Sequence, residues 1–398
     1  MTDEKPHGDD GTHRAARLPF ARHLLSAAPV LLLVTCITTF LSERGLLGGF
    51  ESAALDMWLQ VKAPRPVGDL VIVTIDDTDY KDLFGKKSPL APDKVQELIA
   101  AVVAGGPSAV GVDLDTSEEE YAHLDPPKNV VWGRDGVIDE GPADHGGEHG
   151  AAPAVRPGPV LGREGAAAAG LVSGLALMPQ DPDGIIRRYR HEIPILDEHG
   201  GHEEMPTLGW AVVRALPGGA AREASHHPLV LNFAGDRYAF NRLSARDVIA
   251  GAKLAAWATV GPLKNKVVLV GGTYRAARDE YITPVGAMPG VQLVAQAVES
   301  EIHGGGIRPL AHWLMTILEI ASGILLVWIN YRFRMATALM LSLVAMPLFS
   351  LFASLVAFSS LAFWFNFVPT LVGVWIHELI DHAREFRVMH QQLHASHH

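Results

Sequence analysis

The chain has 398 residues and a net charge of −11, from 44 Asp and Glu against 33 Lys and Arg. Residues 42–312 hold 36 of these acids and 25 of the bases, so the whole negative excess lies in this segment. This charge pattern argues against a nucleic-acid partner, because phosphate recognition needs a basic face. Cys36 is the only cysteine and lies in an apolar run, which excludes disulfides and thiol chemistry from the segment 42–312.

Residues 1–23 are predicted to form a disordered cytoplasmic N-terminus, because they begin with a polar stretch of mixed charge. The uncharged apolar run 24–41 is long enough to cross a bilayer as a helix. A cleavable signal peptide is the alternative, since a basic stretch before an apolar core also marks secretion. The run is longer than a typical signal core, and residues 41–44 lack a small-x-small cleavage pattern. We therefore expect a transmembrane helix.

The next segments predict an α/β domain. Residues 50–61 have apolar positions at helical spacing and predict an amphipathic helix close to the membrane. Leu70 to Asp77 and Ser108 to Asp115 are short β-branched runs that predict buried strands. Between them lies a predicted helix with Asp93 as its N-cap, ending at Gly105. A strand, helix, strand order with this connection length is typical of a parallel right-handed crossover.

The middle of the segment has a weaker pattern, and the fold of residues 135–260 is not fixed by it. Residues 135–159 are dense in Gly, Pro and Ala and predict a mobile loop. His145 and His149 lie in this loop without the spacing of a zinc site, so no metal is expected. Candidate strands are 175–178, 190–196 and 229–233, and a candidate helix is 207–216.

A last buried strand is predicted at 266–272 and a last helix at 287–302, after which the chain becomes strongly apolar. We expect three C-terminal transmembrane helices and a short cytoplasmic tail. The predicted segments are the exported domain 42–312, the spans 313–329, 335–358 and 361–379, and the tail 380–398. The predicted fold class is an α/β exported sensory domain with a mixed, partly parallel sheet, inserted between one N-terminal and three C-terminal transmembrane helices.

The basic residues that flank the spans predict the orientation. They lie before the first span, between the second and third, and after the fourth: Arg14, Arg17, Arg22, Arg332, Arg334, Arg384 and Arg387. Short loops rich in Lys and Arg stay on the cytoplasmic side. Four crossings therefore place both termini in the cytoplasm and residues 42–312 outside the bacterial inner membrane.

Several motifs of the exported segment resemble those of one known family. They are a membrane-proximal helix with Glu51 and Asp56, VIVTIDD at 71–77, the turn and strand 106–115, DPDGIIRR at 181–188, and the closing block 263–290. Together they resemble the CHASE domain of type two, an extracellular sensory module of bacteria associated with cyclases and histidine kinases. Residues 86–93 (KKSPLAPD) depart from the family, which carries an aromatic and Pro-rich motif there.

The resemblance implies a sensor. Three transmembrane helices directly after the domain are usual in that family, and a cyclase or kinase commonly follows them. Here about 19 residues follow Leu379, so we expect no catalytic output domain on this chain.

Acidic residues at the ends of predicted strands are the candidate ligand-binding residues. Asp76 and Asp77 end one strand, and Asp113 and Asp115 share one face at the end of another. The carboxyl edge of a parallel sheet is where open α/β folds bind ligands, and clustered oxygens could bind a hard cation. Asp279, in the closing block, joins this set. The alternative, which we favour, is that these acids cap helices and pair with Lys or Arg.

Other motifs predict no catalysis. The DPDG stretch at 181–184 lacks the further ligands of a calcium loop and predicts a plain turn before a strand. No phosphate-binding loop, zinc motif or nucleophile elbow occurs, so we expect no catalytic residues, no metal and no cofactor.

Three residues of the spans are candidates for intramembrane coupling. Glu319 is costly to bury in a bilayer, and its alternative role is to reach headgroups or a helix partner. Pro347 and Pro369 are expected to kink the third and fourth spans. Apolar residues at 379, 386, 389 and 393 could extend the last helix as a short coiled-coil stub.

The preferred hypothesis is a membrane sensor. Its expected partners are the lipid bilayer, an unknown small ligand, a separate cytoplasmic cyclase, kinase or protease, and a second copy of the chain, with no nucleic acid. The alternatives are a membrane-tethered exported enzyme and a structural scaffold of an envelope complex.

Overall fold

The computed structural model describes residues 20–139, 154–196 and 201–395. It divides into two compact units. The α/β domain comprises Asp56–Pro309 with Leu361–Trp364, and the helical unit comprises the chain up to Leu55, Leu310–Ser360 and the chain from Phe365.

The centre of the domain is a six-stranded sheet in which every neighbouring pair is parallel. Its order is β11-β1-β12-β2-β3-β6. The strands are β1 (Leu70–Ile75), β2 (Ala109–Asp113), β3 (Val130–Arg134), β6 (Ser173–Leu175), β11 (Asn241–Ser244) and β12 (Val267–Gly272). All six residues of β1 are buried, as expected for a β-branched strand covered on both faces. The predicted α/β class is confirmed, but this sheet, predicted to be mixed and partly parallel, is parallel throughout.

The predicted crossover needs one correction. β1 and β2 are parallel and are joined through α4 (Pro92–Ala104), but β12 lies between them. The ends of β1 and β2 are therefore not adjacent at the sheet edge. The predicted N-cap Asp93 is also wrong, since Ala91 occupies that position and Pro92 opens the helix. Proline suits the first turn of a helix because its fixed φ is already helical, and because the N–H groups of the first turn have no hydrogen-bond partner within the helix.

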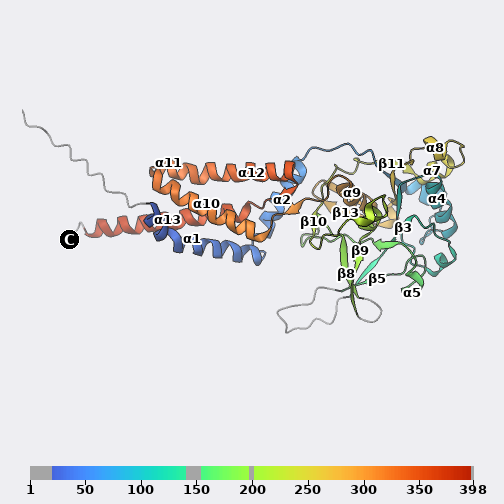
Figure 1. Ribbon diagram of the computed structural model, residues 1–398, viewed down its shortest axis with the longest axis horizontal. Coiled ribbons are helices and arrows are strands. Elements are labelled where there is room, and N and C mark those ends of the chain that lie inside the picture. Colours follow the sequence, from blue (N-terminus) through green and yellow to red (C-terminus); the bar gives the residue numbers. More distant parts are fainter. Residues whose placement is uncertain (1–19, 140–153, 197–200, 396–398) are drawn as a thin grey trace, which may run out of the picture. The chain divides into compact units, whose positions relative to one another are not determined.

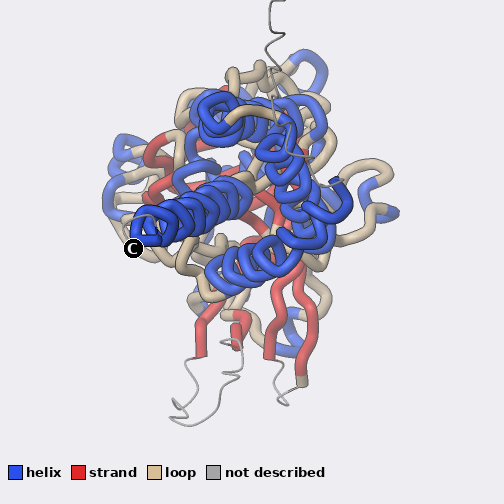
Figure 2. The backbone as a smooth tube through the Cα atoms, turned by 90° about the vertical axis from the view of Figure 1, so that its left-hand side faces the viewer, coloured by secondary structure: helices blue, strands red, loops and turns tan. Residues whose placement is uncertain are grey.

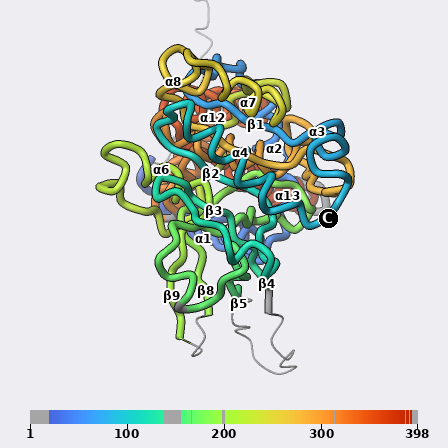
Figure 3. Tube along the Cα trace, turned by 90° about the vertical axis from the view of Figure 1, so that its right-hand side faces the viewer, coloured from blue at the N-terminus to red at the C-terminus, as the bar shows by residue number. Residues whose placement is uncertain are grey.

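Helices cover both faces of the sheet, as Figure 3 shows for α4 and α6 (Leu208–Ala215). Val71, Val73 and Ile75 of β1 belong to the core formed with α4 and α7 (Ala245–Gly251), whereas Leu70 and Ile72 belong to the core formed with α6 and α9 (Gly290–Ile302). This alternation follows from the two-residue period of a strand. Gly271 allows α9 to pack closely, because a Cβ there would lie 2.4 Å from the Cβ of Val291.

A second, four-stranded sheet projects from the domain, at the bottom of Figures 2 and 3. Its order is β4 (Gly136–Asp139), β5 (Ala154–Pro157), β8 (Glu192–Leu196) and β9 (His202–Pro206). β4 pairs with β5 antiparallel. The predicted loop over 135–159 is thus wrong at both of its ends, where short alternating segments pair with each other. His145 and His149 lie outside the described residues.

The other elements of the domain are short. They are α2 (Gly48–Val61, which enters the domain at Asp56), α3 (Asp77–Asp82), η1 (Glu119–His123), α5 (Gly165–Ala168), β7 (Arg188–Tyr189), η2 (Gly219–Ala221), β10 (Leu229–Val230), α8 (Trp257–Val260), η3 (Arg275–Ala277), β13 (Glu280–Thr283), β14 (Gly286–Pro289), β15 (Arg308–Pro309) and β16 (Phe363–Trp364).

The helical unit contains the long apolar helices, which run side by side in Figure 1. They are α1 (Phe20–Glu43), α10 (His312–Arg332), α11 (Met335–Met340), a π-helical turn (Leu341–Ala345), α12 (Met346–Leu361) and α13 (Val368–Ala395). α1, α10 and α13 contact one another. The π-helical turn ends at Ala345, just before the start of α12, whose second residue is Pro347; a distortion was expected near this proline because it lacks an N–H.

Three helices of the described residues are long and apolar enough to cross a membrane: Phe20–Glu43, Trp313–Arg332 and Met335–Leu361. The predicted fourth span, 361–379, is not one helix, because α12 ends at Leu361 and α13 begins at Val368. Pro369 consequently lies in the first turn of α13, where a missing N–H costs nothing, so the predicted kink there is wrong. A fourth crossing stays a prediction.

Candidate functional site

The acids that end β1 are held by caps and ion pairs. Asp76 is the N-cap of α3 and accepts the backbone N–H groups of Thr78 and Asp79, each at 2.8 Å. Asp77 accepts the Nε and the backbone N–H of Arg275 at 3.1 and 2.9 Å. Asp76 follows β1 directly, so its carboxylate meets the first N–H groups of α3, whereas Asp77 bonds to an arginine from a distant part of the chain.

Sequence reasoning missed Asp79 as a structural residue at this edge. Its carboxylate is fully buried and accepts Arg246 Nε at 2.7 Å and the backbone N–H of Ala245 at 3.0 Å. Asp79 therefore joins α3 to the start of α7. Its position three residues after the cap Asp76 is the signal that could have found it.

The remaining predicted acids lie at the ends of other elements. Asp115 accepts the hydroxyl of Ser117 at 2.6 Å and its backbone N–H at 3.0 Å. Asp279 accepts the backbone N–H of Gly290, the first residue of α9, at 3.1 Å. A Cβ at Gly290 would lie 2.5 Å from the Asp279 carboxylate, so glycine is what permits this cap.

Asp113 differs from these acids because no described residue donates a hydrogen bond to its carboxylate or forms an ion pair with it. Burial raises its pKa to about 7, and the charges of Asp279 and Asp135 add to this shift. Burial also raises the pKa values of Asp135 and Asp279. Within the described residues, no three His, Cys, Asp or Glu side chains are placed to hold a metal ion together. Ligand binding by Asp76, Asp77, Asp113, Asp115 and Asp279 stays a prediction.

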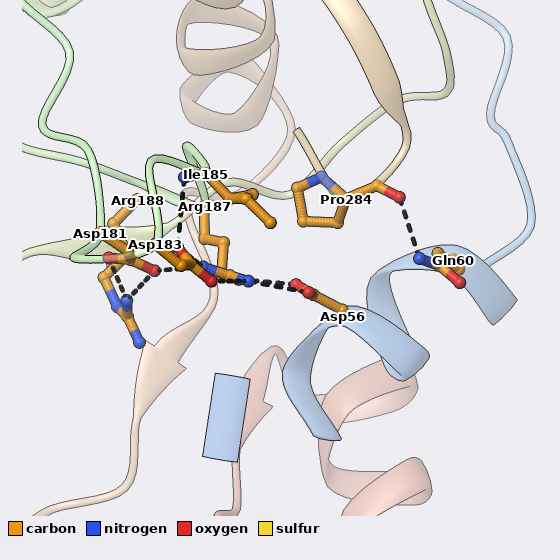
Figure 4. Close-up of polar contacts among 8 residues, drawn as sticks. All are labelled: Asp56, Gln60, Asp181, Asp183, Ile185, Arg187, Arg188 and Pro284. Carbon is orange, nitrogen blue, oxygen red and sulfur yellow. Dashed lines mark hydrogen bonds and ion pairs between the residues drawn. The ribbon is translucent and has the colours of Figure 1, made fainter. Parts of the chain in front are cut away.

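Among the described residues, the most extensive ion-pair network of the domain surrounds Arg187, whose side chain is only 1% exposed (Figure 4). Its Nε and Nη2 donate to the two oxygens of Asp56 at 2.6 and 2.8 Å. Nη1 donates to Asp181 at 3.0 Å and to Asp183 at 2.9 Å, and Nη2 also donates to Asp183 at 2.8 Å. Arg188 pairs with Asp181. We call these five residues the Arg187 cluster.

The electrostatics of the Arg187 cluster are those of a satisfied buried charge. The hydrogen bonds that Arg187 donates to its carboxylates, to Asp56 first, raise the pKa of the guanidinium above its ordinary value. Hydrogen bonding to Arg187 in turn lowers the pKa of Asp183 to about 2. The five hydrogen bonds use the planar fork of donors that only arginine provides, including a bidentate pair with Asp56.

The local sequence explains how the loop presents Arg187. Gly184 has a φ of +77°, which a side chain would disfavour, and Asp183 accepts the N–H of Ile185 at 3.2 Å. The plain turn predicted for this DPDG stretch is present, and β7 follows it. Prediction from sequence missed that Asp181 and Asp183 form ion pairs, because their common partner, Arg187, lies outside the turn.

The cluster connects α2 to the middle of the domain. Asp56 comes from α2, and one turn later Gln60 donates to the carbonyl of Pro284 at 3.1 Å, as Figure 4 also shows. Beyond Arg187, the backbone continues this connection: Ile186 N–H donates to Ile282, and Leu231 N–H donates to the Arg187 carbonyl. In the chain, α2 follows directly after α1 and a turn at 44–47.

In the helical unit, Glu319 accepts the hydroxyl of Thr38 at 3.4 Å. Both line a cavity of about 30 Å³ with Pro369, Thr370 and His377. A cavity of this size has room for water, which needs two or more polar partners. Glu319 thus has a partner on another helix, Thr38 of α1, which is one of the two alternative roles expected for it. A coupling role for Glu319, Pro347 and Pro369 stays a prediction.

Comparison with known families agrees with the geometry of the domain. The model of the CHASE2 domain matches residues 30–330, from within α1 through the whole α/β domain to α10. No curated protein and no solved structure gave a significant match. Since the family model covers more than half of the chain, the chain belongs to the CHASE2 family of sensory extracellular domains.

Proposed function

We propose that this protein is a sensor of the bacterial cytoplasmic membrane whose α/β domain lies outside the cell membrane and binds a small ligand. The observation that carries this proposal is the extent of the family match, residues 30–330. The match begins within α1 and ends within α10, and both helices are long and apolar enough to span a membrane.

The orientation follows from the basic residues near the helix ends. Arg22 lies near the start of α1, Arg332 and Arg334 lie between α10 and α11, and Arg384 and Arg387 lie in the second half of α13. Basic residues favour the cytoplasmic side. With α13 as a fourth crossing, both termini are cytoplasmic and the domain is extracytoplasmic.

The Arg187 cluster supports a route for the signal. Asp56 fixes α2 to the loop of Arg187, and α2 is continuous in the chain with α1. A ligand that binds one conformation of the domain more tightly shifts the population toward it. Any change that moves the Arg187 loop therefore acts on α2, and the helices pass it to a separate cytoplasmic protein such as a cyclase, kinase or protease.

The domain acts by binding rather than catalysis in this proposal. The acids at the carboxyl edge support it, since Asp76, Asp77 and Asp79 are engaged by caps and by arginines rather than directed at a shared reacting centre.

Single-cysteine labelling tests the topology. In a Cys36→Ala background, cysteines replace two exposed residues, Tyr238 of the domain and Val388 of α13. We expect a membrane-impermeant maleimide to label Tyr238→Cys in intact spheroplasts, and Val388→Cys only after lysis. Labelling of Val388→Cys alone in intact spheroplasts would overturn the proposed function.

A further inference from the structure

An open pocket of about 410 Å³ lies at the amino edge of the parallel sheet, opposite to the edge where the predicted acids lie. Ser108 precedes β2, Lys128 and Asn129 precede β3, and Ser173 begins β6. Because neighbouring strands are parallel, their first residues come together at one edge. α6 contributes Arg214 to the same pocket.

The charge of this pocket is opposite to that of the domain as a whole. Lys128 and Arg214 are its two charged groups, and no acid is among the described residues that line it. Both cations are exposed, and neither forms an ion pair or side-chain hydrogen bond with any residue that the structure describes. The chain elsewhere carries more acids than bases, and Arg187, the one buried arginine among the described residues, is paired with carboxylates of the chain itself.

The rest of the lining suits a small organic molecule. Val131 is a buried residue of the lining, and Val172 and Ala211 add apolar surface. The hydroxyls of Ser108 and Ser173 and the amide of Asn129 add neutral hydrogen-bonding groups. Pockets for small ligands have volumes of about 300 to 1,000 Å³ and combine an apolar surface with a few polar groups.

We infer that this pocket binds a small organic anion, with its carboxylate or phosphate group between Lys128 and Arg214 and its short apolar part against Val131. An anion bound between the two cations would be attracted by both of them. The planar guanidinium of Arg214 can hold two oxygens of one carboxylate or phosphate, whereas Lys128 provides a point charge.

The pocket gives the proposed sensor a ligand site, and its role in the cell rests on that proposed function. Anion binding is measured on purified protein and does not depend on membrane orientation. Failure of binding with a correct topology would overturn the pocket alone, whereas a reversed topology with intact binding would overturn the proposed function alone.

Titration calorimetry of the purified full-length protein in detergent tests the inference, with inorganic phosphate and succinate as two separate probes at constant ionic strength. We expect saturable binding of at least one probe. Lys128→Ala and Arg214→Ala should each raise its dissociation constant at least about tenfold, the effect of losing one charge-assisted contact. Which probe binds more tightly identifies phosphate or carboxylate as the recognised group.

Two further variants serve as controls. Ala215→Trp places a bulky neutral side chain in the lining and should abolish binding without changing the charge. Lys87→Ala removes an exposed lysine far from the pocket lining and should leave binding unchanged. Circular dichroism confirms that each variant is folded. The inference is wrong if neither probe binds saturably, or if binding survives in the double variant Lys128→Ala and Arg214→Ala.

Discussion

Arg187 and the pair Lys128 and Arg214 are cations of the same domain in opposite situations. Arg187 is buried and uses its donors on three carboxylates of the chain. Lys128 and Arg214 are exposed, line an open pocket and have no charged partner among the described residues. A buried charge must be compensated by the chain itself, whereas exposed charges can remain available to a ligand. The first arrangement predicts a structural connection and the second a binding site.

The comparison is tested most strongly at Arg187. Arg187→Met leaves Asp56 and Asp181 without their shared cation in a poorly hydrated place, so we expect a loss of about 3–5 kcal/mol in the free energy of unfolding. Denaturant unfolding monitored by tryptophan fluorescence measures it. Arg188→Ala is the matched control, because the side chain of Arg188 is 34% exposed and Asp181 is its only ion-pair partner among the described residues; its cost should be about 1 kcal/mol or less. Equal losses for the two variants would contradict the comparison.

The connection to α2 is tested at Asp56. Asp56→Asn keeps the size of the side chain but removes the charge that receives two of the Arg187 hydrogen bonds, so we expect a loss of about 2 kcal/mol. Hydrogen exchange should accelerate in α2 from Asp56 to Val61 more than in α4, which lies outside the network. Gln60→Ala removes one exposed hydrogen bond of α2 and should have a much smaller effect. Unchanged exchange in α2 would show that the Arg187 cluster does not hold this helix.

The sequence predicted what depends on local pattern. The buried strands at 70–77, 108–115 and 266–272 were found because β-branched runs bounded by turn residues mark parallel strands. Strand order was not found, because β12 is inserted between β1 and β2 by pairing far along the chain. Arg187 was missed for the same reason, since Asp56 precedes it by 131 residues. The residues that line the pocket come from several separate segments of the chain, and no local sequence pattern indicates that these segments lie together in the fold.

The acids extend the comparison, because Asp183 and Asp113 respond to pH in opposite directions. The pKa of Asp183 is lowered to about 2, so its contribution to stability is present above its ordinary pKa and is lost as the pH falls through about 2. The pKa of Asp113 is raised to about 7, so folding favours its protonated form. Stability from Asp113 is complete below about pH 4 and is lost as the pH rises through 7.

We therefore expect the free energy of unfolding to fall by roughly 1 kcal/mol between pH 6 and pH 8 through Asp113. The measurement is the difference between the unmodified protein and Asp113→Asn at each pH, since histidines that titrate in this range contribute equally to both. Asp183→Asn is the control and should show no such difference there, because Asp183 stays ionised throughout. A pH dependence that is identical in the unmodified protein and Asp113→Asn would place the titrating group elsewhere.

The smallest effect on stability is expected where the effect on binding is largest. Removing Lys128 and Arg214 together breaks no ion pair with a described residue. The free energy of unfolding without ligand should stay within about 0.5 kcal/mol of the unmodified protein, and denaturant unfolding in chloride buffer measures it. With a saturating anion the two proteins should differ, because a ligand that binds only the folded state adds to its stability. A large loss of unfolding free energy in chloride buffer would mean that Lys128 and Arg214 stabilise the fold, as Arg187 does. The distinction between the two sites would then be wrong.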